Sequence, residues 1–124
     1  MNYSITLHDA VIPPENFGKV TGIEGATVQD VIEFVGEYLT DRYVTGNETD
    51  GIDLSDSGFY DHASYDFEYE LRGAVLVHCK PGAFMEGRDA EEGAGERWRW
   101  FVKNDYTLGY VAAEITVTWP EMVL

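Results

Sequence analysis

The segment TVQDVIEFVGEYL, residues 27–39, carries the clearest structural pattern in this chain. Its apolar residues recur every three or four positions, which is the spacing of one face of an α-helix. Thr27 followed by Asp30 matches a variant of the capping box that opens helices, and Gly46 is placed to end one. We therefore predict a helix from Thr27 to about Val44, buried along an apolar stripe. The stripe consists of Val28, Val31, Ile32, Val35 and Leu39.

Segments on both sides of this helix alternate apolar and polar side chains, as half-buried strands do. The predicted strands are residues 3–11, 65–79, 97–103 and 106–119. The predicted loops, rich in glycine or polar residues, are residues 15–25, 47–64 and 81–96. We expect one α+β domain, residues 1–124, in the order β-α-β-β-β, in which the helix packs on one face of a four-stranded antiparallel sheet. The other face is expected to be polar and to carry Glu68, Glu70, Arg72, Arg97, Arg99, Lys103 and Glu114.

Length and composition restrict the class of protein. With 124 residues, 44% of them hydrophobic, the chain is long enough to bury a core as one domain. Cys79 is the only cysteine, so no disulfide can form within the chain, which fits a reducing compartment. The N-terminal sequence lacks the pattern of a signal peptide, and no segment approaches the roughly 20 apolar residues that span a bilayer. We expect a soluble cytoplasmic protein that does not contact a membrane.

The charge of the chain is concentrated in one block. Residues 24–70 contain thirteen acids and a single base, Arg42, and so carry −12 of the formal net charge of −15. The rest of the chain is nearly balanced, with ten acids and seven bases. A block of one sign creates a local field that selects partners of the opposite sign. We therefore predict a basic protein surface as the partner and do not expect direct binding of a nucleic acid.

Several of these acids recur three or four residues apart in the predicted helix and should line one of its faces, with neighbours about 5–6 Å apart. Phosphates along a nucleic-acid strand are spaced on a similar scale, so such a row can occupy a groove of Lys and Arg side chains. An ordinary solvated helix face would show the same pattern, and that alternative stays open. The candidate partner-binding residues are Asp30, Glu33, Glu37 and Asp41 in the helix and Glu48, Asp50, Asp53, Asp56 and Asp61 in the segment after it.

Other motifs do not indicate a metal, a cofactor or a catalytic set. Residues 47–56 resemble a calcium loop in composition, but aligning Gly51 with the turn position places Gly46 and Ser57 at the first and last ligand positions. No pair of histidines has the spacing of zinc ligands. Cys79 is expected to be a small buried residue. The histidines are His8, His62 and His78.

The charge pattern favours an inhibitor that mimics nucleic-acid phosphates and blocks a basic groove on a DNA- or RNA-handling enzyme. Phages and mobile elements use such proteins against restriction and CRISPR enzymes. An immunity-type or regulatory protein that neutralises a basic effector would have the same charge. Adaptation to high salt is a third interpretation, although residues 71–124 contain eight acids and six bases rather than a uniform excess of acid. A small enzyme is the fourth, without an identifiable catalytic set.

Overall fold

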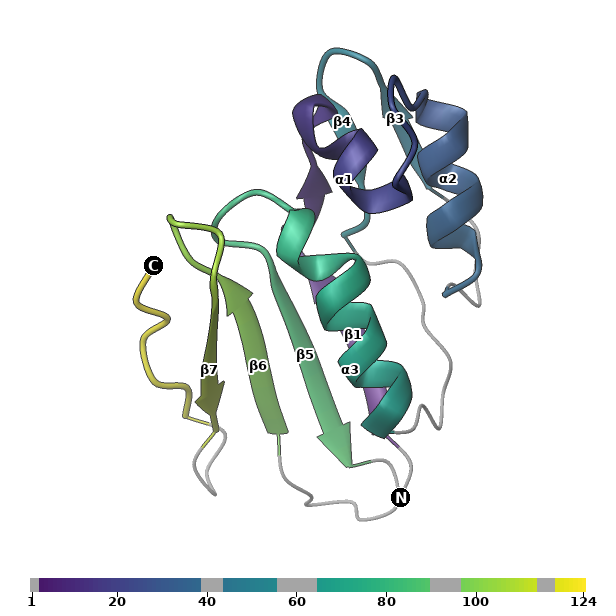
Figure 1. Ribbon diagram of the computed structural model, residues 1–124. Helices are drawn as coiled ribbons and strands as arrows, with labels where there is room; N and C mark the ends of the chain where they lie inside the picture. The colour runs from purple at the N-terminus through teal and green to yellow at the C-terminus, as the bar shows by residue number, and fades with distance from the viewer. Residues whose placement is uncertain (1–2, 39–43, 56–64, 90–96, 114–117) are drawn as a thin grey trace.

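The computed structural model describes residues 3–38, 44–55, 65–89, 97–113 and 118–124 (Figure 1). It has an α+β fold with a four-stranded antiparallel sheet, as the sequence predicted, and a second, three-stranded sheet. The larger sheet has the order β1 (Tyr3–His8), β5 (Phe84–Asp89), β6 (Arg97–Val102) and β7 (Leu108–Ala112). The smaller has the order β2 (Val11–Ile12), β4 (Gly51–Asp53) and β3 (Thr45–Asn47). The helices are α1 (Phe17–Thr21), α2 (Val28–Gly36) and α3 (Tyr65–Ala74), with 3-10 turns η1 (Pro14–Asn16) and η2 (Leu76–His78).

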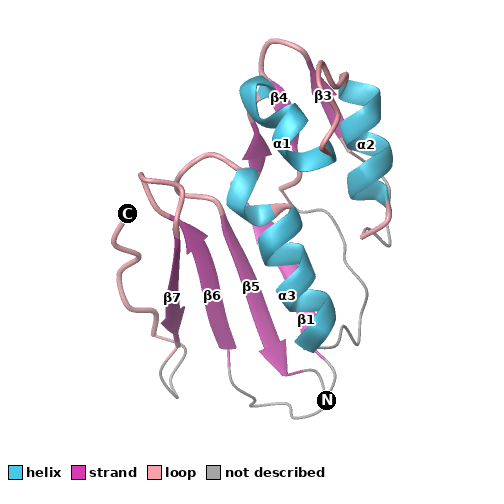
Figure 2. Cartoon of the chain, viewed as in Figure 1, coloured by secondary structure: helices cyan, strands magenta, loops and turns pink. Residues whose placement is uncertain are grey.

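Helix α3 packs on one face of the larger sheet (Figures 1 and 2). The buried side of this sheet follows from the alternation of strand residues, because Ile5 and Leu7 of β1 are buried while Thr6 between them is exposed. Gly87 of β5 lies beneath Trp98 of β6, and a Cβ at Gly87 would be 2.5 Å from the indole ring. Only glycine leaves room for this indole on the helix-covered face.

The smaller sheet forms a second lobe with α1 and α2 (Figure 1). The predicted strand 3–11 is divided between the two sheets, because the chain turns at Asp9, whose φ of +51° is in the left-handed region. Ile12 and Ile52 face the helices of this lobe and are fully buried, as are Val31 and Val35 of α2. These four side chains belong to one core and hold α2 on the sheet.

An aromatic cluster joins the two lobes. The ring of Tyr38, just after α2, lies 6.1 Å from that of Phe34 and 5.9 Å from that of Phe67 in α3, measured between centroids. All three residues pack against the same hydrophobic core. The core is therefore continuous from one sheet to the other.

The predicted helix is shorter in the structure. Thr27 caps it as predicted, but α2 ends at Gly36, and Val44 is not helical. Glycine has a low helix propensity, which weakens the helix at this point. Leu39 lies outside the described residues.

The prediction of a strand over residues 65–79 was wrong, since the structure has α3 and η2 there. The period-two interpretation placed Tyr69 in the core, but Tyr69 is 64% exposed. The buried side chains instead recur three or four residues apart, which is the helical spacing. They are Glu68, Leu71, Arg72, Val75, Leu76 and Cys79. Glu68 and Arg72 consequently lie inside the molecule and not on a polar sheet face.

The three predicted loops also contain regular structure. Residues 15–25 include α1, which buries Phe17 and Val20 one turn apart. Residues 81–96 include β5, a central strand of the larger sheet. Residues 47–64 include β4, which pairs with β3 as a hairpin, while 56–64 lie outside the described residues. The order β-α-β-β-β and the single main helix are therefore corrected: the described residues form three α-helices, and α3 rather than α2 covers the larger sheet.

Two predicted strands near the C-terminus are present. Strand β6 matches residues 97–103, and β7 occupies the first part of 106–119. Residues 114–117 lie outside the described part of the chain. In the segments that the structure describes, no helix has both the length and the apolar character needed to cross a bilayer.

Candidate partner-binding surface

The N-terminus of α2 is fixed by the capping box that the sequence predicted. The Asp30 N–H donates to Thr27 Oγ1 at 3.2 Å, and the Thr27 N–H donates to Asp30 Oδ2 at 2.9 Å. This reciprocal pair satisfies two backbone donors that a helix leaves free at its start. Asp30 thus has a structural role in addition to the partner-binding role predicted for it.

Helix α2 exposes its acids on the side opposite its core. Val31 and Val35 are fully buried, whereas Glu33 and Glu37, the C-cap residue of α2, are exposed and Asp30 is half-buried. Gln29 Nε2 donates to Glu33 Oε1 at 3.4 Å. No Lys or Arg of the described segments forms an ion pair with these three carboxylates. The helix therefore presents a row of negative charge that is not neutralised within the described segments.

The acidic surface continues from α2 onto α3 through Tyr38. Partial burial raises the pKa of the Tyr38 phenol, and the charges of Glu70 in α3 and Glu37 raise it further. Both carboxylates therefore act on the same phenol. Glu70 was not among the predicted binding residues, because residues 65–79 were interpreted as a strand. The helical spacing of the buried residues in that segment is the signal that would have placed it here.

The hairpin of β3 and β4 holds two further candidates at its tip. Asn47 Oδ1 accepts hydrogen bonds from the backbone N–H groups of Thr49 at 2.9 Å and Asp50 at 2.6 Å. Gly51 follows with φ of +91°, and a Cβ there would clash with the carbonyl oxygen of Ile12. These contacts fix the turn and leave the side chains of Glu48 and Asp50 exposed.

Asp53 lies apart from the acids of α2. Its neighbour Ile52 faces the helices and is fully buried, and successive side chains of a strand point to opposite faces. Asp53 is therefore on the outer face of the smaller sheet, where its Oδ1 accepts the Ser55 N–H at 2.8 Å. The structure thus groups Asp30, Glu33 and Glu37 on one surface and separates Asp53 from them. Asp41, Asp56 and Asp61 lie outside the described residues.

The histidines and the cysteine occupy separate environments. His8 stacks on Phe84 with 4.7 Å between ring centroids. Burial and the nearby charge of Lys19 lower the pKa of His78, and burial raises the pKa of the Cys79 thiol to about 12. Among the residues whose placement is described, no group of three or more His, Cys, Asp or Glu is arranged to hold a metal ion. His62 is not within the described segments.

Comparison with known proteins does not identify the chain: no protein-family model, curated protein or solved structure matches it. Its function therefore has to be inferred from the chemistry of its own surfaces.

Proposed function

We propose that this protein is an inhibitor that binds a basic groove of a DNA- or RNA-handling enzyme and occupies the place of nucleic-acid phosphates. The observation that carries the proposal is the block of thirteen acids and one base in residues 24–70. Glu33 on α2 and Glu37 at its C-cap are exposed members of this block. An inhibitor of the anti-restriction or anti-CRISPR type has this charge and acts in the cytoplasm, where its single thiol stays reduced.

The spacing of the acids suits this role. Carboxylates three or four residues apart on a helix lie about 5–6 Å from one another, close to the separation of phosphates along a strand. Each can accept charge-assisted hydrogen bonds from Lys or Arg side chains that normally hold phosphates. The negative field also accelerates encounter with a basic groove, and this effect weakens as salt rises.

The ion pairs formed within the described part of the chain lie away from this surface. Arg72 pairs with Glu68 between α3 and the larger sheet. Arg99 Nη2 pairs with Glu86 Oε1 at 2.8 Å, on the face of that sheet that α3 does not cover. Since no Lys or Arg of the described segments pairs with the acids of α2, these acids remain available to an external partner.

The proposal is tested by capture of the partner from a host lysate at low and at high salt, followed by competition with duplex DNA and with RNA. We expect retention at about 0.05 M NaCl, loss by about 0.5 M because the Debye length shortens several-fold, and release of the partner by nucleic acid. Retention that ignores both salt and nucleic acid contradicts the phosphate-mimic mechanism. Release by salt but not by nucleic acid indicates instead a protein that neutralises a basic effector.

A matched pair of variants locates the binding surface. Glu33→Lys reverses one charge on α2, and Glu121→Lys makes the same change in net charge at an exposed position near the C-terminus. We expect Glu33→Lys to weaken binding at least tenfold, on the order of 1.4 kcal/mol, and Glu121→Lys to have little effect. Equal losses in the two variants would show that net charge, and not the surface of α2, determines binding.

A further inference from the structure

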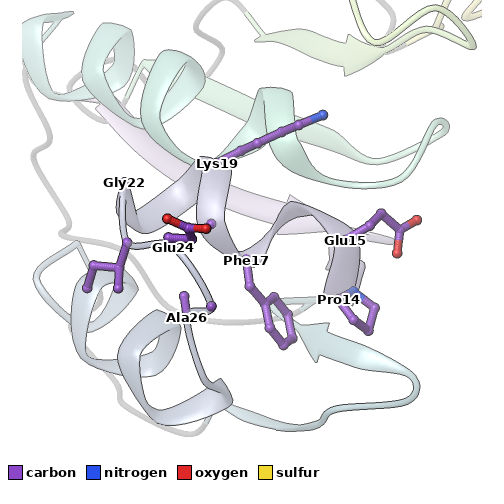
Figure 3. A pocket seen from close by; sticks show the side chains of 10 residues that line it. Pro14, Glu15, Phe17, Lys19, Gly22, Glu24 and Ala26 are labelled. Carbon is purple, nitrogen blue, oxygen red and sulfur yellow. The ribbon is translucent and has the colours of Figure 1, made fainter.

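A groove of about 450 Å³ opens on α1 and on the segment that connects it to α2 (Figure 3). Its apolar lining includes Phe17, Ile23 and Ala26. Phe17 is buried beneath it, while Ile23 is 49% exposed. The groove therefore keeps apolar surface open to solvent next to the start of α2.

The wall of this groove is held by backbone hydrogen bonds. The Gly22 N–H donates to the Gly18 carbonyl oxygen at 2.8 Å, and the Ala26 N–H donates to that of Ile23 at 3.3 Å. Gly22 and Gly25 have φ of +73° and +69°, a conformation that glycine adopts without strain. The Ile23 N–H also donates to Thr21 Oγ1 at 3.1 Å, so the turn fixes the position of Ile23.

The charge around the groove is negative. Glu15 and Glu24 are both exposed and lie on its lining. Lys19 also belongs to the lining, but its side chain extends away from Glu24 (Figure 3) and its charge acts on His78 of η2. Glu24 is the first residue of the acidic block that continues onto α2. An apolar occupant of the groove would therefore lie among carboxylates.

We propose that the groove receives an apolar side chain flanked by Lys or Arg residues, supplied by the same basic protein that the acids of α2 bind. This inference rests on the proposed function and adds the chemical class of the contact. Charge attraction alone gives rapid encounter and does not discriminate strongly among basic surfaces. An apolar side chain held in a pocket supplies the discrimination, as buried anchors do in other interfaces.

Two end-blocked peptides of equal charge test the groove directly: Lys-Lys-Leu-Lys-Lys and Lys-Lys-Gly-Lys-Lys. Calorimetry at one salt concentration gives the ratio of their dissociation constants. We expect the leucine peptide to bind about tenfold more tightly, since burial of part of a leucine side chain is worth roughly this factor. We also expect it to shift the NMR amide signals of residues 22–26. Equal affinities of the two peptides would overturn the inference.

Three variants assign the difference to the groove. Ile23→Ser removes an exposed apolar wall, and Ala26→Phe fills the space; both should reduce the ratio to about twofold or less. Val123→Ser is the matched control, because Val123 is 70% exposed in the C-terminal segment, and it should keep the full ratio. A ratio unchanged by both groove variants would place the leucine elsewhere and refute the proposal.

The two proposals can fail separately. If both peptides bind with equal affinity and salt weakens their binding equally, the charged surface binds them without the groove. If the leucine peptide keeps its advantage while nucleic acid does not displace the natural partner, the groove contact stands and the phosphate-mimic mechanism fails.

Discussion

At the scale of single residues, the most unusual group is the carboxylate of Glu68, which is enclosed between α3 and the larger sheet with only 3% of the residue exposed. Arg72 Nε lies 3.5 Å from its Oε1, and the Arg72 guanidinium carbon lies 4.0 Å from the centre of the Trp100 ring. Burial raises the pKa of Glu68, although Arg72 and hydrogen bonds from Trp98 and Trp100 act in the opposite direction. Desolvation is therefore the larger effect on this buried pair.

The raised pKa of Glu68 predicts how pH affects stability. The folded state binds the proton of the Glu68 carboxyl more tightly than the unfolded state does. The contribution of this proton to the free energy of unfolding is therefore fully present below the unfolded pKa of about 4.5, and it is lost as pH rises through the folded pKa. The pKa of His78 is lowered in the fold, so His78 reduces the free energy of unfolding as pH falls below about 6.5. We therefore compare the native protein with Glu68→Gln by urea unfolding at pH 5 and pH 7.

We expect Glu68→Gln to be at least as stable as the native protein at pH 7, because glutamine places no charge in a site where desolvation outweighs the pairing with Arg72. We also expect the native protein to gain stability when the pH is lowered from 7 to 5. In the variant this gain should shrink or reverse, because of these two groups only His78 still titrates. Identical pH dependence in the two proteins would mean that Glu68 has an ordinary pKa in the fold.

At the scale of elements, α3 offers a direct test of helix against strand. Gly73 lies within this helix, is exposed, and has no atom within 4 Å of where a Cβ would be. Gly73→Ala should therefore raise the free energy of unfolding by about 0.5–1 kcal/mol, the usual gain for this change in an open helical position. Gly87→Ala is the contrasting variant and should destabilise, because the added Cβ would meet the Trp98 ring. Destabilisation by Gly73→Ala would be inconsistent with a helix here.

The sequence predicted some elements well for physical reasons that can be identified. Helix α2 has both a capping box and a stripe of apolar residues, and β6 alternates Trp98 and Trp100 with arginines, so each carries two consistent signals. Helix α1 buries only Phe17 and Val20, which is too few residues to define a period. Strand β5 contains Gly87 where an indole needs space, and this glycine made the segment resemble a loop.

The same limits apply to the acidic surface. The exposure of Glu33 and Glu37 followed from their helical spacing relative to the apolar stripe, and the structure agrees. The separation of Asp53 could not be predicted, because it depends on the pairing of β4 with β2 and β3. The position of Glu70 on the acidic surface depends on α3. The alternation of aromatic residues in residues 65–79 made this helix resemble a strand.

At the scale of the whole molecule, charge is distributed unevenly between the two lobes. The acids of α2 and of the hairpin tip belong to the smaller lobe. Arg88 and Arg97 lie directly opposite each other in the larger sheet, on the face that carries Arg99 and that α3 leaves uncovered. Like charges directly opposite in a sheet are destabilising. The fold therefore contains like-charge repulsion in both lobes, and the whole chain has a net charge of −15.

This repulsion predicts that moderate salt stabilises the protein. Like charges at helical spacing each cost a few tenths of a kcal/mol, so screening several of them should raise the free energy of unfolding by about 1 kcal/mol between roughly 0.02 and 0.5 M NaCl. The double variant Glu33→Gln/Glu37→Gln should lose part of this gain, whereas Glu121→Gln should keep it. Urea unfolding at each salt concentration measures both effects. If the native protein instead folds only near molar salt, its acidity reflects adaptation to a saline host, because such proteins need salt in order to fold. The acids of α2 would then need no partner to explain them.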